Sequence, residues 1–91
     1  MIAVVSHDAG GAEILSSWIL RSQESFCLAL SGPAVLIFRR KLGELPNYPL
    51  ESAIEMCDWV LCGTSWQSPI EKQAIVQAAE AGKRAIVFID H

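Results

Sequence analysis

The feature that most constrains the fold is a regular alternation of short apolar runs with longer segments of helical periodicity. The apolar runs fall at residues 2–5, 26–30, 59–62 and 85–89, and the first and last of them are rich in β-branched residues. Helical patterns lie between them, at residues 12–23, 34–42, 50–57 and 69–81. Such alternation is typical of a parallel sheet with helical crossovers. We therefore predict an α/β fold in one domain, residues 1–91, with an open three-layer sheet of four or five parallel strands.

Residues 34–42 fit two different structures. Their Ala-Val-Leu-Ile-Phe run has strand propensity and would allow a hairpin with residues 26–30. Pro33, however, suits the first position of a helix, and Gly43 suits the position just after its end. The basic residues 39–41 would then occupy the last turn, where cations oppose the helix dipole. We predict a helix here, with the strand as the alternative.

The last helical segment begins with a capping-box pattern, Ser68-Pro69-Ile70-Glu71. In such a box the serine hydroxyl accepts a hydrogen bond from the backbone N–H three residues on, and the Glu71 carboxylate reaches back to the first residue. Gly82 supplies the stop. The pattern predicts a helix over residues 69–81, with Glu71 acting as part of its cap.

The composition narrows the class of protein. Of 91 residues, 52% are hydrophobic and 19% are charged, and the formal net charge is −3. The apolar content excludes a disordered chain, and the mild acidity argues against nucleic acid or an anionic membrane as the main partner. The sequence has neither a basic leader region nor an apolar run near the ~20 residues of a membrane span. We therefore predict a soluble, cytoplasmic chain without a membrane span.

The three cysteines, Cys27, Cys57 and Cys62, show no metal or redox pattern. They are odd in number and no two of them have CxxC spacing. We predict reduced residues of the core.

Polar and small residues gather where the predicted strands end, at residues 6–11, 31–33, 63–67 and 90–91. Open α/β sheets bind ligands outside the carboxyl ends of their strands, so this edge is the candidate site. His7 and Asp8 are the candidate catalytic residues, because an imidazole titrates near neutral pH and can act as a base. The alternatives are that His7 tethers two loops and that Asp8 caps the following helix.

Backbone groups at the same edge suit an anionic or hydroxyl-rich ligand. Gly10 and Gly11 open a helix and leave bare N–H groups at its positive end. Five further residues are candidate ligand contacts: Gly63, Thr64, Ser65, Asp90 and His91. The chain has neither the dinucleotide fingerprint nor a P-loop, so we assign no cofactor.

A further signal comes from four segments: residues 4–13 (VVSHDAGGAE), 32–34 (GPA), 58–67 (DWVLCGTSWQ) and 88–91 (FIDH). They resemble the N-terminal half of bacterial glycosyltransferase-like proteins, which share the two-domain GT-B fold with UDP-N-acetylglucosamine 2-epimerase and lipid A disaccharide synthase. The resemblance implies a Rossmann-like half that holds the acceptor, with a sugar or sugar phosphate as ligand. A C-terminal half would bind most of the sugar nucleotide. The resemblance also implies that this chain is a fragment of such a protein, or a half that dimerises. A complete small binding domain is the alternative.

Two other functions stay open. His7-Asp8 after the first strand faintly resembles the His-Pro-Asp-Asp motif of N-acetylglucosaminyl deacetylases, although the proline and two aspartates are missing. A zinc-dependent hydrolase would need ligands from His7, Asp8, Asp90 and His91. The other possibility is a non-catalytic module that self-associates. The apolar pairs Ile14/Trp18 and Leu15/Ile19 exceed what one sheet face needs, which predicts a symmetric dimer.

Overall fold

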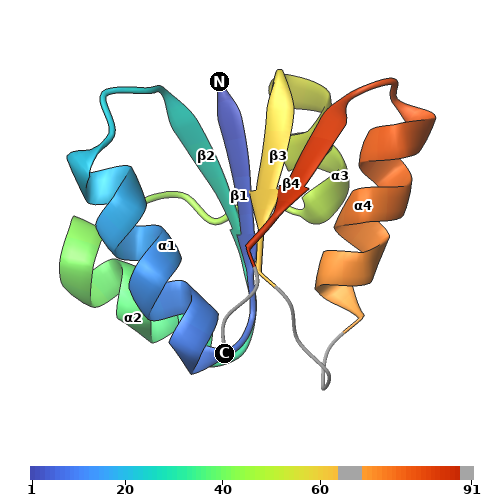
Figure 1. Cartoon of the computed structure of the whole chain (residues 1–91). Helices are drawn as coiled ribbons and strands as arrows, with labels where there is room; N and C mark the ends of the chain where they lie inside the picture. The colour runs from blue at the N-terminus through green and yellow to red at the C-terminus, as the bar shows by residue number, and fades with distance from the viewer. Residues whose placement is uncertain (64–68, 89–91) are drawn as a thin grey trace.

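A sheet of four parallel strands forms the centre of the molecule in the computed structural model, which describes residues 1–63 and 69–88 (Figure 1). The strands lie in the order β2-β1-β3-β4. Their bounds are β1 (Ile2–Ser6), β2 (Phe26–Leu30), β3 (Trp59–Cys62) and β4 (Arg84–Val87). This is the predicted open α/β fold.

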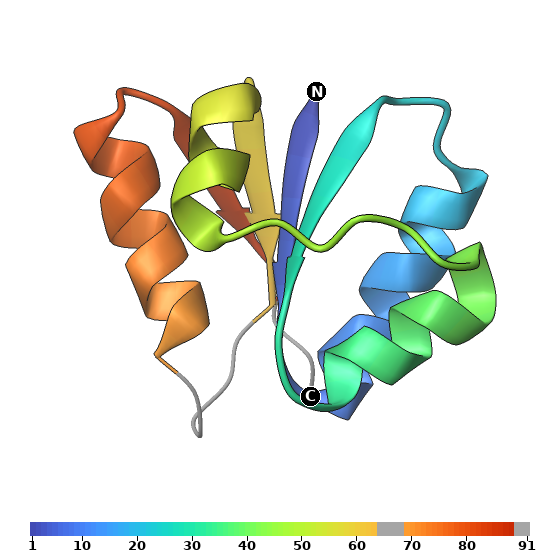
Figure 2. The ribbon, with the colours of Figure 1, turned by 180° about the vertical axis from the view of Figure 1, so that it is seen from behind.

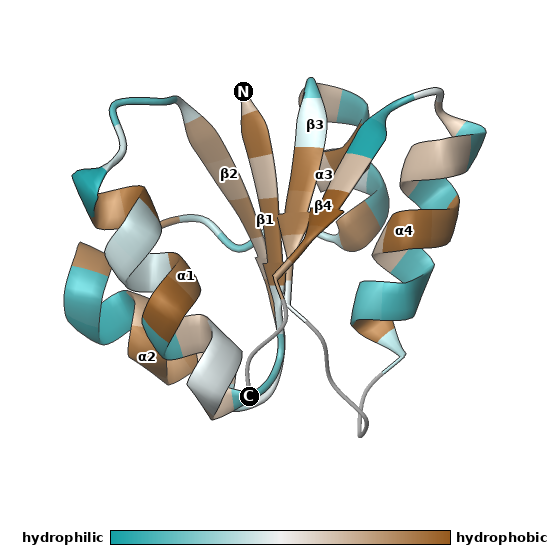
Figure 3. Cartoon of the chain, in the orientation of Figure 1, coloured by the Kyte–Doolittle hydropathy of each residue, from teal (hydrophilic) through white to brown (hydrophobic). Residues whose placement is uncertain are grey.

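Helices cover both faces of the sheet. On one face α1 (Ala9–Arg21) packs beside α2 (Pro33–Leu42), and on the other α3 (Leu50–Met56) lies beside α4 (Ile70–Glu80) (Figures 1 and 2). The strands are apolar along most of their length, whereas the helices alternate apolar and polar bands (Figure 3). Each helix therefore buries one side against the sheet and leaves the other to solvent.

The first strand, β1, contributes side chains to the hydrophobic core on both faces of the sheet. All five of its residues are buried. Ile2 and Val4 pack with α1 and α2, whereas Ala3 and Val5 pack with α3 and α4. This division follows from the alternation of side chains along a strand, and β1 reads as a continuous apolar run because a helix layer lies on each side of it.

The predicted helix at residues 34–42 is confirmed as α2. Pro33 is its first residue, and Gly43 follows its end with φ +82°. Lys41 joins α2 to α1, since its ammonium donates 2.8 Å to the Glu13 carbonyl and lies 3.0 Å from the Glu13 carboxylate. The other three helices end one or two residues earlier than predicted, α1 at Arg21, α3 at Met56 and α4 at Glu80, and α1 begins three residues earlier, at Ala9.

The start of α4 differs from the predicted capping box. The helix begins at Ile70, and its cap, Pro69, makes no side-chain hydrogen bond. Ser68 lies outside the described residues. The Glu71 side chain is only 3% exposed, and neither carboxylate oxygen has a hydrogen-bond partner among the residues that the structure describes. Glu71 is therefore a buried acid, and its predicted capping contact with Ser68 lies outside the described residues.

The apolar stripe of α1 is divided between core and surface. Leu15 and Ile19 are buried against the sheet, whereas Ile14 and Trp18 are 41% and 40% exposed. This confirms that the stripe is wider than one sheet face needs. Within the described parts of the chain, no helix combines the length and the apolar character that crossing a membrane requires.

Candidate functional site

The carboxyl ends of β1 and β3 meet where the strand order changes direction. From β1 the chain moves to β2 on one side, and from β3 it moves to β4 on the other. The Gly63 N–H donates 3.3 Å to the Val5 carbonyl, so the loops that follow the two strands start side by side. A crevice at such a switch point is the usual ligand site of open α/β sheets.

Glu71 reaches this junction from α4. A Cβ added to Gly63 would lie 3.2 Å from the Glu71 Oε2 atom, 3.8 Å from Leu15 Cδ1 and 4.0 Å from Gly11 Cα. The carboxylate therefore lies across the end of β3, close to the first turn of α1. Glycine at position 63 allows this approach, because a side chain there would crowd the carboxylate.

Asp8 is the second acid at the junction. It precedes α1 as the capping residue, but its side chain makes no capping hydrogen bond. Its Oδ1 atom is buried without a partner among the described residues and lies 3.4 Å from the position of a Gly11 Cβ. Asp8 therefore occupies the capping position of α1, as the alternative predicted, but without a capping hydrogen bond from its side chain.

Burial and the neighbouring charge change the acidity of Glu71. Loss of solvation raises the pKa of this carboxyl to about 7, and the charge of Asp8 adds to the increase. At neutral pH the carboxyl is thus close to the midpoint of its titration.

The buried Ser6 hydroxyl at the end of β1 also lacks a hydrogen-bond partner within the described chain.

This arrangement changes the expectation for Gly10 and Gly11. Gly10 is exposed and Gly11 is buried beside Asp8. The positive end of α1 suits an anion, but the carboxyls of Asp8 and Glu71 already lie near its first turn. A phosphate placed there would meet like charge. A ligand that donates hydrogen bonds would instead satisfy the buried oxygens.

His7 extends toward a different strand end from Asp8. Its Nδ1 atom lies 2.8 Å from the Ser31 hydroxyl, and its ring packs on Gly32, where an added Cβ would be 2.4 Å from Cε1. The His7 carbonyl accepts a 3.0 Å hydrogen bond from the Ala34 N–H at the start of α2. The geometry therefore favours the alternative in which His7 tethers two loops. The structure does not unite His7 and Asp8 in one cluster.

The remaining predicted contacts lie outside the described residues: Thr64, Ser65, Asp90 and His91. Within residues 1–63 and 69–88, no group of three or more His, Cys, Asp or Glu side chains is placed to hold a metal ion. The zinc alternative thus gains no support from the described part of the chain.

Sequence reasoning missed Glu71 as a site residue, although a signal was present. Glu71, Ala74 and Ala78 share one face of α4 and are all buried. An acid in line with two alanines on the core face is unusual, because carboxylates are rarely buried without a partner. This periodicity was overlooked because Glu71 also fits the capping-box pattern.

Comparisons with known proteins add no relative. No protein-family model, curated protein or solved structure matches this chain. The resemblance to glycosyltransferase-like proteins therefore stays a prediction, and the site must be judged on its own geometry.

The three cysteines should be inert in the folded chain. All three are free and buried, as predicted, and burial raises the pKa of Cys62 to about 11, with the charge of Glu71 adding to it. We expect no thiol to react with a disulfide reagent at about pH 8 until the protein unfolds, because the thiolate is the nucleophile. Absorbance titration before and after addition of urea measures this. Rapid labelling of a native thiol would contradict it.

Proposed function

We propose that the carboxyl end of the sheet binds a neutral, hydroxyl-rich ligand such as a sugar. The observation that supports this proposal is a set of buried oxygen atoms near the switch point. They have no hydrogen-bond partner within the described chain, and they belong to Ser6, Asp8 and Glu71. A buried polar atom without a partner costs free energy, which a bound donor recovers. Sugar hydroxyls are donors of suitable size and number.

The charge of the site separates a sugar from a simple anion. Two carboxyls, Asp8 and Glu71, lie close enough for the charge of the first to raise the pKa of the second. Near neutral pH the charge of Asp8 and the partly ionised Glu71 would repel inorganic phosphate. A sugar phosphate fits this proposal when its ring, and not its phosphate, faces Glu71.

The resemblance to glycosyltransferase-like proteins suggests what such binding would serve. We propose that the chain is the acceptor-side half of such a protein. A carboxyl with a pKa of about 7 is well matched to accept a proton from an acceptor hydroxyl at neutral pH. In this proposal Glu71 is the base, and His7 holds the loop at the start of α2.

Titration followed by backbone amide NMR tests the proposal, with N-acetylglucosamine, UDP-N-acetylglucosamine and inorganic phosphate as probes. We expect either sugar probe to shift the amides of residues 8–12 and of Gly63, and Glu71→Gln to weaken binding by about tenfold or more, because the amide replaces one acceptor oxygen. Glu80→Gln is the matched control, since Glu80 is exposed on the same helix. Phosphate that binds more tightly than both sugars, or an absence of shifts at millimolar sugar, would contradict the proposal.

A non-catalytic, self-associating module is the second candidate, favoured by the apolar surface of the chain. Large apolar side chains are exposed on α1, α2, α4 and β4, among them Leu36 at 63% and Val76 at 57%. Such a module would need no ligand, so sugar binding without self-association would rule it out.

A further inference from the structure

The two edges of the sheet differ in how they are protected. On the outer edge of β2, the Asn47 side chain accepts a 2.7 Å hydrogen bond from the Leu30 N–H and donates at 3.0 Å to the Leu30 carbonyl. The Tyr48 N–H donates 2.8 Å to the Leu28 carbonyl. The connection from α2 to α3 crosses β2 and carries these residues (Figure 2). This edge is therefore closed to another strand.

The opposite edge, β4, is open. Its outer side has no strand or loop bonded to it among residues 1–63 and 69–88. It contains neither proline nor a bulge, and Arg84 is its one charged residue. Edge strands without such protection are templates for pairing with another chain. Ile86 at the middle of the edge is 43% exposed.

Helix α4 presents apolar side chains on its side nearer the same edge. α3 packs on β2 and β1, and α4 packs on β3, β4 and β1, so the side of α4 that faces away from α3 is the side nearer the outer edge of β4. Gln77 and Ala81 line the groove toward α3. At ~100° per residue, the stripe containing Ile75 and Ala79 lies on the other side of the helix. Ile75 is 39% exposed there.

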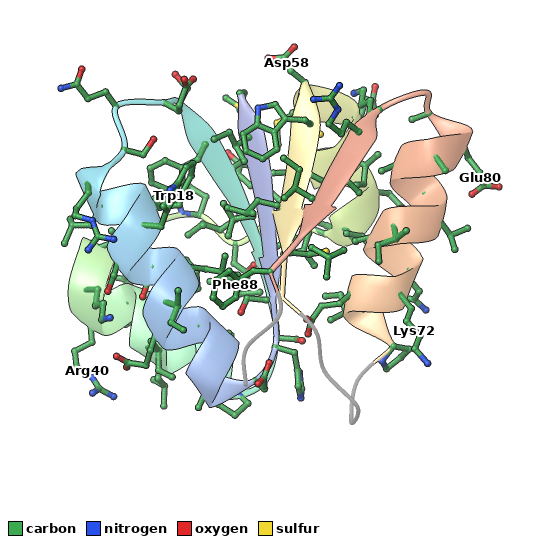
Figure 4. The ribbon with its side chains drawn as sticks, viewed as in Figure 1. Trp18, Arg40, Asp58, Lys72, Glu80 and Phe88 are labelled. Carbon is green, nitrogen blue, oxygen red and sulfur yellow. The ribbon has the colours of Figure 1, made fainter. Side chains whose placement is uncertain are left out.

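We propose that a second copy of this chain pairs with the β4 edge in antiparallel orientation, forming a continuous eight-stranded sheet about a two-fold axis. Side chains alternate along the strand, so Arg84, Ile86 and Phe88 lie on the α1 face, whereas Ala85 and Val87 lie on the α4 face. Figure 4 shows Phe88. Residues opposite each other in an antiparallel pair must share a face.

That rule allows several registers, and we propose the one that places the exposed Ile86 at the centre of the pair. Ile86 of one copy lies opposite Ile86 of the other, and Arg84 lies opposite Phe88, where a guanidinium can rest on the aromatic ring. α4 ends at Glu80 and β4 begins at Arg84. Five residues back along the helix and two residues forward along the strand each span roughly 7 Å, which brings Ile75 to the level of Ile86. In this dimer Ile75 is therefore the α4 residue expected nearest the partner copy, and small Ala79 lies on the same side of the helix.

The area available fits a second copy of the chain. A standard interface buries ~800 Å² on each partner. This is about one seventh of the 5309 Å² surface of one copy. The exposed side of α1 at Ile14 and Trp18 is apolar too, but it carries no unpaired strand edge that would set a register. The inference does not depend on ligand binding.

Sedimentation velocity from ~1 to ~100 μM tests the proposal, because a modest interface predicts a dissociation constant in the micromolar range. We expect the native chain to dimerise, and Ile75→Lys and Ile86→Lys each to weaken the dimer by about tenfold or more. Val76→Lys is the matched control, since Val76 is the next residue on α4 and points away from the edge. Circular dichroism confirms that each variant is folded.

Oxidative cross-linking supplies an independent readout. We expect Ile75→Cys to form a covalent dimer readily and Val76→Cys not to, because the native cysteines are buried and only the introduced thiol is accessible. A native chain that stays monomeric at ~100 μM would overturn the proposal. So would equal weakening by Ile75→Lys and Val76→Lys.

Discussion

Replacing Glu71 with glutamine should stabilise the fold at about pH 8 and leave it almost unchanged at about pH 4. Burial, with help from Asp8, raises the pKa of this carboxyl from 4.5 to about 7 in the folded chain. Between these values the folded state holds a proton that the unfolded state releases, so the free energy of unfolding of the native chain falls as pH rises. The loss approaches about 3 kcal/mol above pH 7, at ~1.4 kcal/mol per pH unit. Glutamine resembles the protonated acid and escapes this loss. Urea unfolding across the pH range measures the difference.

Two further variants isolate the cause. Glu80→Gln removes an exposed acid from the same helix and should leave the pH dependence of unfolding unchanged. Asp8→Asn removes the charge that raises the pKa of Glu71 and should therefore reduce that dependence. If the free energy of unfolding depended on pH in the same way for the native chain and for Glu71→Gln, ionisation of Glu71 would not destabilise the folded chain. If Glu71→Gln both stabilises the fold and loses sugar binding, the buried acid is retained for function.

The Gly32→Ala variant should lose about 3 kcal/mol of stability, because backbone strain and overpacking each cost roughly 1–3 kcal/mol. Gly32 has φ +56°, a conformation that side chains rarely adopt. An added Cβ would lie 2.4 Å from Cε1 of His7, whose ring is held by its hydrogen bond to Ser31. The imidazole would have to leave Ser31 to make room. Thermal or urea unfolding of the variant measures the loss.

Gly43→Ala is the matched control for backbone strain. Gly43 has φ +82°, but an added Cβ would have no atom within 4 Å, so we expect a loss of only about 1 kcal/mol. In a His7→Ala background, Gly32→Ala should cost no more than Gly43→Ala, because the contact with the ring is gone. Equal losses for Gly32→Ala and Gly43→Ala in the native background would show that His7 is not packed against Gly32.

Much of the fold follows from local signals. Short apolar runs predicted every strand, because strands of a parallel sheet are buried on both faces. Pro33 and Gly43 decided the helix at residues 34–42 over a strand, since the fixed φ of proline suits a helix start and the positive φ of glycine suits its end. The candidate edge was also predictable, because the carboxyl ends of parallel strands lie together.

The partners of individual side chains depended on the tertiary structure. His7 and Asp8 are adjacent in the sequence, yet His7 contacts Ser31 and Gly32, whereas Asp8 lies near Glu71. Local patterns cannot predict this, because the strand order decides which loops meet and neighbouring residues leave a strand in different directions.

The sequence by itself thus determined the α/β class and the order of the helices and strands, because these depend on propensity and periodicity along the chain. Only the tertiary structure decided that Glu71 is a buried acid. A local capping pattern and a buried position compete for the same residue, and Glu71 lies beside Gly63 and close to Asp8 only after β3 has paired with β1 and α4 has packed on the sheet. Contacts between residues far apart in the sequence set the solvation and charge around that carboxyl, and therefore its chemistry.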